Sequence, residues 1–331
     1  MPLLDGSRYR PPSWLPDGHA QSIVPALFRR VNGIRFRRER IGTPDGDFLD
    51  LDWMAHPVAG NRLAVLCHGL EGSSDGRYIR GMTRALFRAG WDILAWNYRG
   101  CGGEPNLQLG FYHSGAIEDL ETVLRHSILV RPGAPLALVG FSLGGNLVLR
   151  YLGASTGVPT QLRAAVAISA PCDLRACSEA LARPENRIYM WRFLRDLRRK
   201  VREKNRRFPG ALDMNGLKRM RTFREFDDRF TAPLHGFDDA EDYWARASAR
   251  PVLGSVRVPT YLLNARNDPF LAGGCFPLRE AQQNRNLFVE TPEHGGHVGF
   301  LENRPDRLFY SERRTIHFLE EALAGRLDSF R

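Results

Sequence analysis

The sequence has no apolar run near the roughly 20 residues that a membrane-spanning helix needs, and its first ten residues lack the apolar stretch of a signal peptide. Cysteine is scarce, odd in number and scattered, with no metal-ligand spacing. The five cysteines are Cys67, Cys101, Cys172, Cys177 and Cys275. These absences argue against a transmembrane span, a disulfide framework and a zinc site, and they predict a protein of the reducing cytoplasm.

Acidic residues are outnumbered by basic ones, 37 to 47, which gives a formal net charge of +10. Such a balance is compatible with nucleic acid, an anionic membrane or an acidic substrate as partner. The densest basic run, residues 195–207, has no finger, RRM signature or KH loop beside it. We interpret the run as a solvated helix face and expect no nucleic-acid partner. The oligomeric state is left open.

Six short runs are apolar at nearly every position instead of alternating, which is typical of strands that are covered on both faces. These runs are 62–67, 91–96, 135–140, 164–169, 258–264 and 286–290. Helix-like stretches lie between them, such as 78–89, 115–130 and 143–152. Alternating strands and helices predict an α/β fold with a mostly parallel, doubly wound sheet.

The alternation stops between residues 171 and 250, a basic and aromatic stretch with helical character. Apolar residues recur there at helical spacing, opposite a row of arginines: Met190, Trp191, Leu194, Leu197 and Val201. One interpretation is an amphipathic helix that packs on the core. Another is a lid over an active site, whose outer face also contacts an anionic membrane. The predicted organisation is an α/β core of 1–170 and 251–331 with a helical lid insertion at 171–250.

The strongest motif is Gly140-Phe-Ser142-Leu-Gly144, which matches G-x-S-x-G between an apolar strand and a helix-like segment. A strand-to-helix turn this tight brings backbone close to the flanking positions, so both of them need glycine. The turn would lift the Ser142 hydroxyl above the sheet edge. This context predicts a nucleophilic serine.

A serine hydroxyl needs a base and an acid that orients the base, and in this topology they follow in the order Ser, Asp, His. Asp268 comes directly after the apolar run 258–264, and Asp173 is a rival acid after an earlier run. His297 lies in a glycine-rich loop before an apolar stretch, and His294 competes with it. The sequence favours Asp268 and His297.

The turn His68-Gly69-Leu70 follows another apolar run. A His-Gly turn at this place supplies one backbone N–H of an oxyanion hole, here that of Leu70, and the second is the N–H of Leu143. Two such amides stabilise the developing oxyanion, and losing one donor typically costs about 3–4 kcal/mol. His68 itself is interpreted as structural.

These motifs together resemble the YheT-like esterases of the α/β-hydrolase superfamily, which are related to the ABHD phospholipase group. The matching segments run in order along nearly the whole chain: 10–19, 68–73, 97–104, 112–115, 140–145, 267–269 and 294–300. The resemblance implies an α/β-hydrolase fold, a triad of Ser142, Asp268 and His297, and a cap formed by 171–250.

We therefore expect a serine carboxylesterase that acts on short- to medium-chain acyl esters through an acyl-enzyme, with no metal and no organic cofactor. Its partner would be a small-molecule or lipid ester. A phospholipase or lysophospholipase working at a membrane surface is an alternative, as is a non-catalytic binding module that kept the fold. His113 is a weaker candidate for substrate contact.

Overall fold

The computed structural model describes residues 3–4, 7–56 and 62–330. Within them the chain forms one sheet of eight strands. The strands are β1 (Arg37–Gly42), β2 (Phe48–Met54), β3 (Leu63–Cys67), β4 (Asp92–Asn97), β5 (Leu136–Phe141), β6 (Leu162–Ile168), β7 (Thr260–Leu263) and β8 (Leu287–Glu290). Their order in the sheet is β1-β2-β4-β3-β5-β6-β7-β8; β3 to β8 run parallel to one another, and β2 is antiparallel to both of its neighbours, β1 and β4. The predicted mostly parallel α/β sheet is confirmed.

Each of the six apolar runs contains one of the parallel strands or most of it, from β3 to β8. The antiparallel pair β1 and β2 was not predicted, because β1 is a charged edge strand that shows no apolar run. Arg38 and Arg40 of β1 instead pair with Asp52 and Asp50 of β2 across the ladder.

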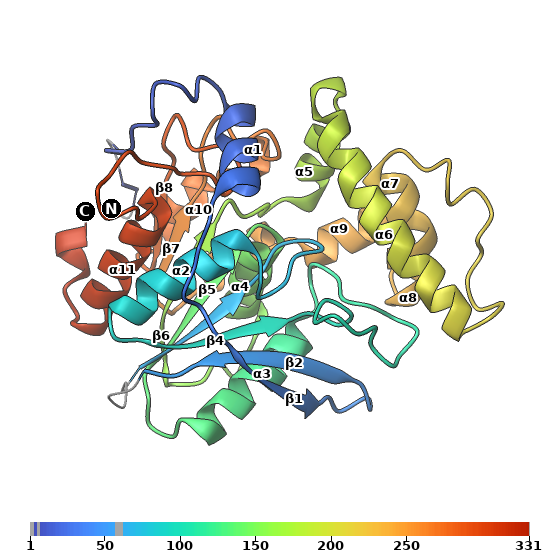
Figure 1. The fold of residues 1–331 in the computed structure, drawn as a ribbon, viewed down its shortest axis with the longest axis horizontal. Helices are drawn as coiled ribbons and strands as arrows, with labels where there is room; N and C mark the ends of the chain where they lie inside the picture. The colour runs from blue at the N-terminus through green and yellow to red at the C-terminus, as the bar shows by residue number, and fades with distance from the viewer. Residues whose placement is uncertain (1–2, 5–6, 57–61, 331) are drawn as a thin grey trace.

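Helices cover both faces of the sheet (Figure 1). On one face lie α2 (Arg77–Arg88) and α11 (Tyr310–Leu323), and on the other α3 (Ile117–Val130), α4 (Leu143–Ala154) and α10 (Leu278–Gln283). Successive residues of β3 pack into the two different apolar clusters, Leu63 and Val65 on the α4 face and Ala64 and Leu66 on the α2 face. Double-sided burial explains why these strands read as continuous apolar runs.

The segment 171–250, hereafter the inserted segment, runs from β6 towards β7 and holds helices but no strand. They are α5 (Leu174–Leu181), α6 (Arg187–Arg207), α7 (Phe223–Phe226), the π-helical turn η2 (Asp227–Thr231), α8 (Ala232–Leu234) and α9 (Ala240–Ala247). In Figure 1 these helices gather to one side of the sheet, with α6 as the longest element. A short 3-10 turn, Pro184–Asn186, lies between α5 and α6, and others span Arg250–Ser255, Gly273–Cys275 and Leu327–Phe330.

Helix α6 follows the predicted amphipathic pattern with one correction. Met190, Leu194, Leu197 and Val201 are buried, but Trp191 is 60 % exposed. The prediction that Trp191 belongs to the buried face was wrong. The four buried residues follow one another at steps of four, three and four residues, so they form one stripe along the helix, and Trp191 lies about 100° around the helix from that stripe. Its ring faces solvent beside the arginines.

The segment before β1 contains a helix, α1 (Gly18–Phe28), that was not predicted from the sequence. Asp17 caps it by accepting a hydrogen bond from the Ala20 N–H at 2.8 Å. Across the described ranges, no helix has both the length and the apolarity to cross a bilayer.

Candidate active site

The candidate site lies at a topological switch point of the sheet, where successive strands are added on opposite sides of β3. Strand β3 pairs with β4 on one side and with β5 on the other. The loops that leave β3 and β5 at their carboxyl ends are therefore neighbours, and such switch points are where open α/β sheets bind ligands. The loop after β3 begins at His68, and the turn after β5 contains Ser142.

Ser142 occupies a strained turn between β5 and α4, with φ 53° and ψ −122°. A Cβ on Gly140 would lie 2.2 Å from the Gly144 carbonyl oxygen, and one on Gly144 would lie 2.4 Å from the Cys67 carbonyl oxygen. Neither position has room for a side chain, so the predicted need for both glycines is confirmed. Strain of this kind persists only where the surrounding structure holds it.

The structure brings Ser142, His297 and Asp268 into one line of hydrogen bonds. Ser142 Oγ lies 2.9 Å from His297 Nε2, and His297 Nδ1 lies 2.8 Å from Asp268 Oδ2. The Asp268 side chain is fully buried and also accepts the Phe270 N–H at 2.9 Å. An ionised carboxylate only accepts hydrogen bonds, so Nδ1 carries the imidazole proton and Nε2 is free to accept from the serine hydroxyl.

The two rival residues lie elsewhere. His294 Nδ1 lies 3.4 Å from Asn267 Nδ2 in an exposed contact. Asp173 caps α5, where its carboxylate accepts the Ala176 N–H at 3.0 Å. Within the described ranges neither side chain has a hydrogen bond to Ser142 or His297.

The loop that carries His297 is fastened by α1, a support that the sequence did not reveal. The His297 N–H donates to Ser22 Oγ at 2.7 Å, and the Gly295 N–H donates to Gln21 Oε1, also at 2.7 Å. Both α1 side chains are buried. The only feature of the sequence that pointed to this region was the segment 10–19, which resembles the family and ends shortly before Gln21 and Ser22.

An aromatic ring covers the imidazole. The Phe270 ring centroid lies 4.0 Å from that of His297, with 30° between the planes. Phe270 also makes edge contacts with Tyr189 and Phe193 of the inserted segment. The side chain of His297 is consequently only 12 % exposed.

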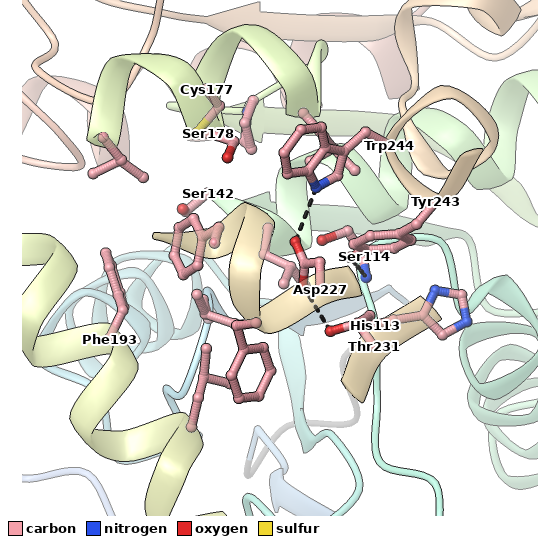
Figure 2. A pocket seen from close by; sticks show the side chains of 18 of the residues that line it. His113, Ser114, Ser142, Cys177, Ser178, Phe193, Asp227, Thr231, Tyr243 and Trp244 are labelled. Atoms are coloured by element: carbon pink, nitrogen blue, oxygen red, sulfur yellow. Dashed lines mark hydrogen bonds between the residues drawn. The ribbon is translucent and has the colours of Figure 1, made fainter. Parts of the chain in front are cut away.

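Ser142 opens into a pocket between the sheet and the inserted segment, with about 760 Å³ of empty space that is partly open to solvent. Most of the wall is apolar, from both regions: Leu70, Phe111, Leu143, Leu174, Leu181, Phe193, Leu197, Phe223, Phe226 and Phe270. Figure 2 shows Ser142 and Phe193 on one side of this space and Asp227, Tyr243 and Trp244 on the other. A wall of this kind suits an apolar substrate chain.

One part of the pocket is polar. Asp227 accepts hydrogen bonds from Thr231 Oγ1 at 2.6 Å and from Trp244 Nε1 at 2.9 Å (Figure 2). Burial raises the pKa of Asp227 to about 7, against the opposing effect of these two donors. In the described residues no basic side chain forms an ion pair with it. His113, the weaker sequence candidate, also lines the pocket, and burial keeps its pKa well below the usual value.

Two backbone amides beside Ser142 lack a protein acceptor. Within the described chain, the N–H groups of Leu70 and Leu143 donate to no protein atom. Leu143 is the first residue of α4, where N–H groups have no partner inside the helix. These are the two N–H groups that the sequence predicts as donors to the oxyanion.

His68 is completely buried, and burial lowers its pKa to about 3, so its ring is neutral. Its Nε2 accepts the Tyr98 N–H at 3.2 Å, which leaves Nδ1 to donate to the Gly69 carbonyl at 2.7 Å. These contacts fasten the start of the loop after β3. Across the described residues no group of three or more His, Cys, Asp or Glu side chains is placed to hold a metal ion.

One large class of enzymes shares this arrangement. In it a strained serine follows β5, a carboxylate follows β7 and an imidazole follows β8. The family model for the alpha/beta hydrolase fold matches residues 64–304, and the chain belongs to that family.

Among curated relatives, YheT of Escherichia coli (strain K12), described by its name as an esterase, is 40 % identical over 288 residues, covering 86 % of this chain and 84 % of YheT. Human Phospholipase ABHD3 is 33 % identical over 321 residues, covering 94 % of this chain and 78 % of that protein. The predicted resemblance to YheT-like esterases is thereby confirmed, and the protein is a hydrolase of the esterase type.

Solved structures agree on the fold. An esterase of Pyrococcus furiosus is 17 % identical with a TM-score of 0.58, covering 87 % of this chain and 91 % of that one. Est1E of Butyrivibrio proteoclasticus, solved with ferulic acid bound, is 15 % identical with a TM-score of 0.55, covering 86 % and 99 %.

Proposed function

We propose that this protein is a serine hydrolase that cleaves carboxylic esters of short- to medium-chain acids through an acyl-enzyme. The observation that carries the proposal is the line of hydrogen bonds from Ser142 through His297 to Asp268 at the wall of an apolar pocket. The relatives named as an esterase and a phospholipase support an ester as the substrate class. We also infer that the inserted segment acts as a lid over the sheet core.

In the proposed mechanism His297 Nε2 takes the hydroxyl proton while Ser142 Oγ attacks the acyl carbonyl. The Leu70 and Leu143 N–H groups would stabilise the oxyanion that forms. Asp268 holds the ring orientation and stabilises the imidazolium. His297 then donates the proton to the departing alcohol, and a water molecule activated by the same ring releases the acid and restores Ser142.

A fluorophosphonate probe and a panel of p-nitrophenyl esters test this proposal. The wild type should react with the probe and hydrolyse the shorter esters, and Ser142→Ala should lose both activities, with a fall in kcat of at least about 10⁴-fold. Labelling that survives in Ser142→Ala would refute the assignment of the nucleophile. A folded wild type that neither labels nor hydrolyses any ester would support the non-catalytic binding module.

A second candidate is a phospholipase or lysophospholipase at a membrane surface, and the outer face of α6 favours it. Ile188 and Trp191 are 71 % and 60 % exposed there. Arg187, Arg192 and Arg199 are exposed beside them and form no ion pair within the described residues. A cationic helix face with exposed apolar side chains is typical of binding to anionic lipid. This candidate predicts faster hydrolysis of micellar phospholipid than of monomeric p-nitrophenyl butyrate, with dependence on anionic lipid.

A further inference from the structure

The loop after β3 has to hold the Leu70 N–H towards the reacting oxygen, and the sheet core fastens both ends of this loop, at Gly69 and at Ser74. The Gly69 N–H donates to the Tyr78 hydroxyl at 2.8 Å, and His68 Nδ1 donates to the Gly69 carbonyl at 2.7 Å. On the other side of Leu70 stands Glu71, whose φ is 52°. This left-handed conformation is unfavourable for a residue with a side chain, so it needs contacts that hold it.

Those contacts come from a small buried cluster around the Glu71 carboxylate. The Tyr112 hydroxyl accepts the Glu71 N–H at 2.7 Å and donates to Glu71 Oε1 at 2.8 Å. Lys200 Nζ lies 2.9 Å from the same Oε1, and the two side chains are only 10 % and 8 % exposed. Lys200 Nζ also lies 4.7 Å from the centre of the Tyr112 ring and 3.3 Å from Cys101 Sγ.

Lys200 belongs to α6, so the cluster joins the inserted segment to the loop beside the nucleophile. Removing one partner of a buried ion pair leaves an uncompensated charge, which is strongly unfavourable. Without Lys200, the Glu71 carboxylate would lose its buried countercharge and move towards water. This movement alters the contacts that keep Glu71 at positive φ, and Leu70 is the residue next to it.

We propose that Lys200 is a positioning residue that acts through Glu71 to orient the Leu70 N–H, so that the oxyanion hole is complete only while helix α6 is docked on the sheet core. The proposal rests on the proposed ester hydrolysis by Ser142. Under this proposal the inserted segment affects kcat, in addition to lining the pocket.

The test compares Lys200→Met with Lys204→Met, using p-nitrophenyl acetate as a substrate too small to need the pocket. Lys204 is a matched control because it is buried one turn further along α6, where it donates to the backbone carbonyls of Asn106 and Gln108, away from Glu71. Loss of one oxyanion donor typically costs about 10²–10³-fold in kcat. Because a displaced donor keeps part of its effect, we expect Lys200→Met to lower kcat about 10–100-fold, with KM changed by less than about threefold.

Lys204→Met should keep kcat within about threefold of the wild type, even where its melting temperature falls by as much as that of Lys200→Met. Lys200→Arg should recover part of kcat. A trifluoromethyl ketone, whose hemiketal oxygen takes the oxyanion position, should bind Lys200→Met more weakly by the same factor as kcat/KM falls.

Glu71→Gln provides a second route if Lys200→Met does not fold, and it should also lower kcat. The double variant should be no worse than the more impaired single variant, because both substitutions remove one interaction. Equal kcat in Lys200→Met and Lys204→Met, or an effect on KM alone, would overturn the proposal. A wild type without esterase activity would instead overturn the proposed function, so the two failures are distinguishable.

Discussion

The sheet core and the inserted segment meet at one pocket but position their side chains by different means. In the core, Ser142, Asp268 and His297 follow three parallel strands of one sheet, β5, β7 and β8, and their backbone is fixed by tight turns and hydrogen bonds. In the inserted segment, the long helix α6 places Phe193 and the turn η2 places Asp227 beside the cavity, and these elements are held by apolar packing against one another. Under the proposed function, the core therefore sets the distances between the reacting atoms, and the inserted segment sets what surrounds them.

This difference predicts two kinds of mutational effect. A change in the core should alter kcat for every ester alike, because it acts on groups that all substrates share. A change in the inserted segment should alter the ranking of substrates or the surface on which the enzyme works. Lys200 is the exception, since it reaches from α6 into the loop after β3.

The largest effect is expected in the core, from Asp268→Asn. An asparagine presents an N–H to the ring as readily as an oxygen, so it no longer holds the proton on His297 Nδ1, and kcat should fall about 10³–10⁴-fold. The measurement is the initial rate with p-nitrophenyl butyrate, accompanied by a thermal melt.

Asp173→Asn is the matched control, because the asparagine oxygen can still cap α5 and only the ion pair with Arg250 is lost. It should lower the melting temperature slightly and keep turnover within about threefold. Near-normal turnover in Asp268→Asn together with a large loss in Asp173→Asn would reverse the assignment of the acid.

A smaller effect is expected on the outer face of α6, from the double variant Ile188→Ser, Trp191→Ser. If this face meets lipid, sedimentation with vesicles that contain phosphatidylglycerol should weaken about tenfold, because two apolar side chains are lost from the interface. Turnover of soluble butyrate ester should not change. Leu129→Ser is the control, since Leu129 is 75 % exposed on α3, away from the inserted segment. Equal sedimentation of both variants, or none by the wild type, would rule out docking through this face.

The smallest effect is expected at Asp227 and depends on pH. Its pKa is raised to about 7 by burial, so the carboxyl is mostly neutral near pH 6 and mostly ionised near pH 8. A charge in an apolar pocket disfavours an acyl chain, so the ratio of kcat/KM for hexanoate ester to that for acetate ester should fall about fivefold between about pH 6 and about pH 8. The ratio cancels any effect of pH on the groups that act on both esters alike.

Asp227→Asn should make that ratio independent of pH, and a slope that persists in the variant would show that another group causes it. The same shift affects stability. The folded protein keeps a proton at Asp227 that the unfolded chain releases near the ordinary aspartate pKa of 3.8, so the wild type should lose stability as pH rises from about 4 to about 7. Thermal melts of Asp227→Asn should show a weaker loss over this range.

The parts of the site that could be predicted are local in sequence. The pattern around Ser142 needs only a strand, a turn and a helix in succession, and the close backbone approach at Gly140 and Gly144 follows from that turn. Asp268 and His297 could be proposed because parallel strands end at one edge of the sheet, so residues that follow different strands become neighbours.

The supports of the site could not be predicted, because they join side chains far apart in the chain. Ser22 reaches the His297 backbone across 275 residues, and hydrophobic periodicity carries no information on such polar pairs. Lys200 lay in a basic run that was interpreted as solvated, yet its amine is buried against Glu71. The position of Trp191 was predicted wrongly because residue spacing alone does not fix the edges of a buried stripe.

The sequence alone determined the class of fold and the chemical types at its centre, since strand burial and the glycine turn leave their pattern in consecutive residues. Only the tertiary structure decided which charged groups are paired, which ring covers the imidazole and where the pocket turns polar. Those outcomes depend on how helices of the inserted segment dock on the sheet, and docking is a competition among many distant contacts that no single stretch of sequence records.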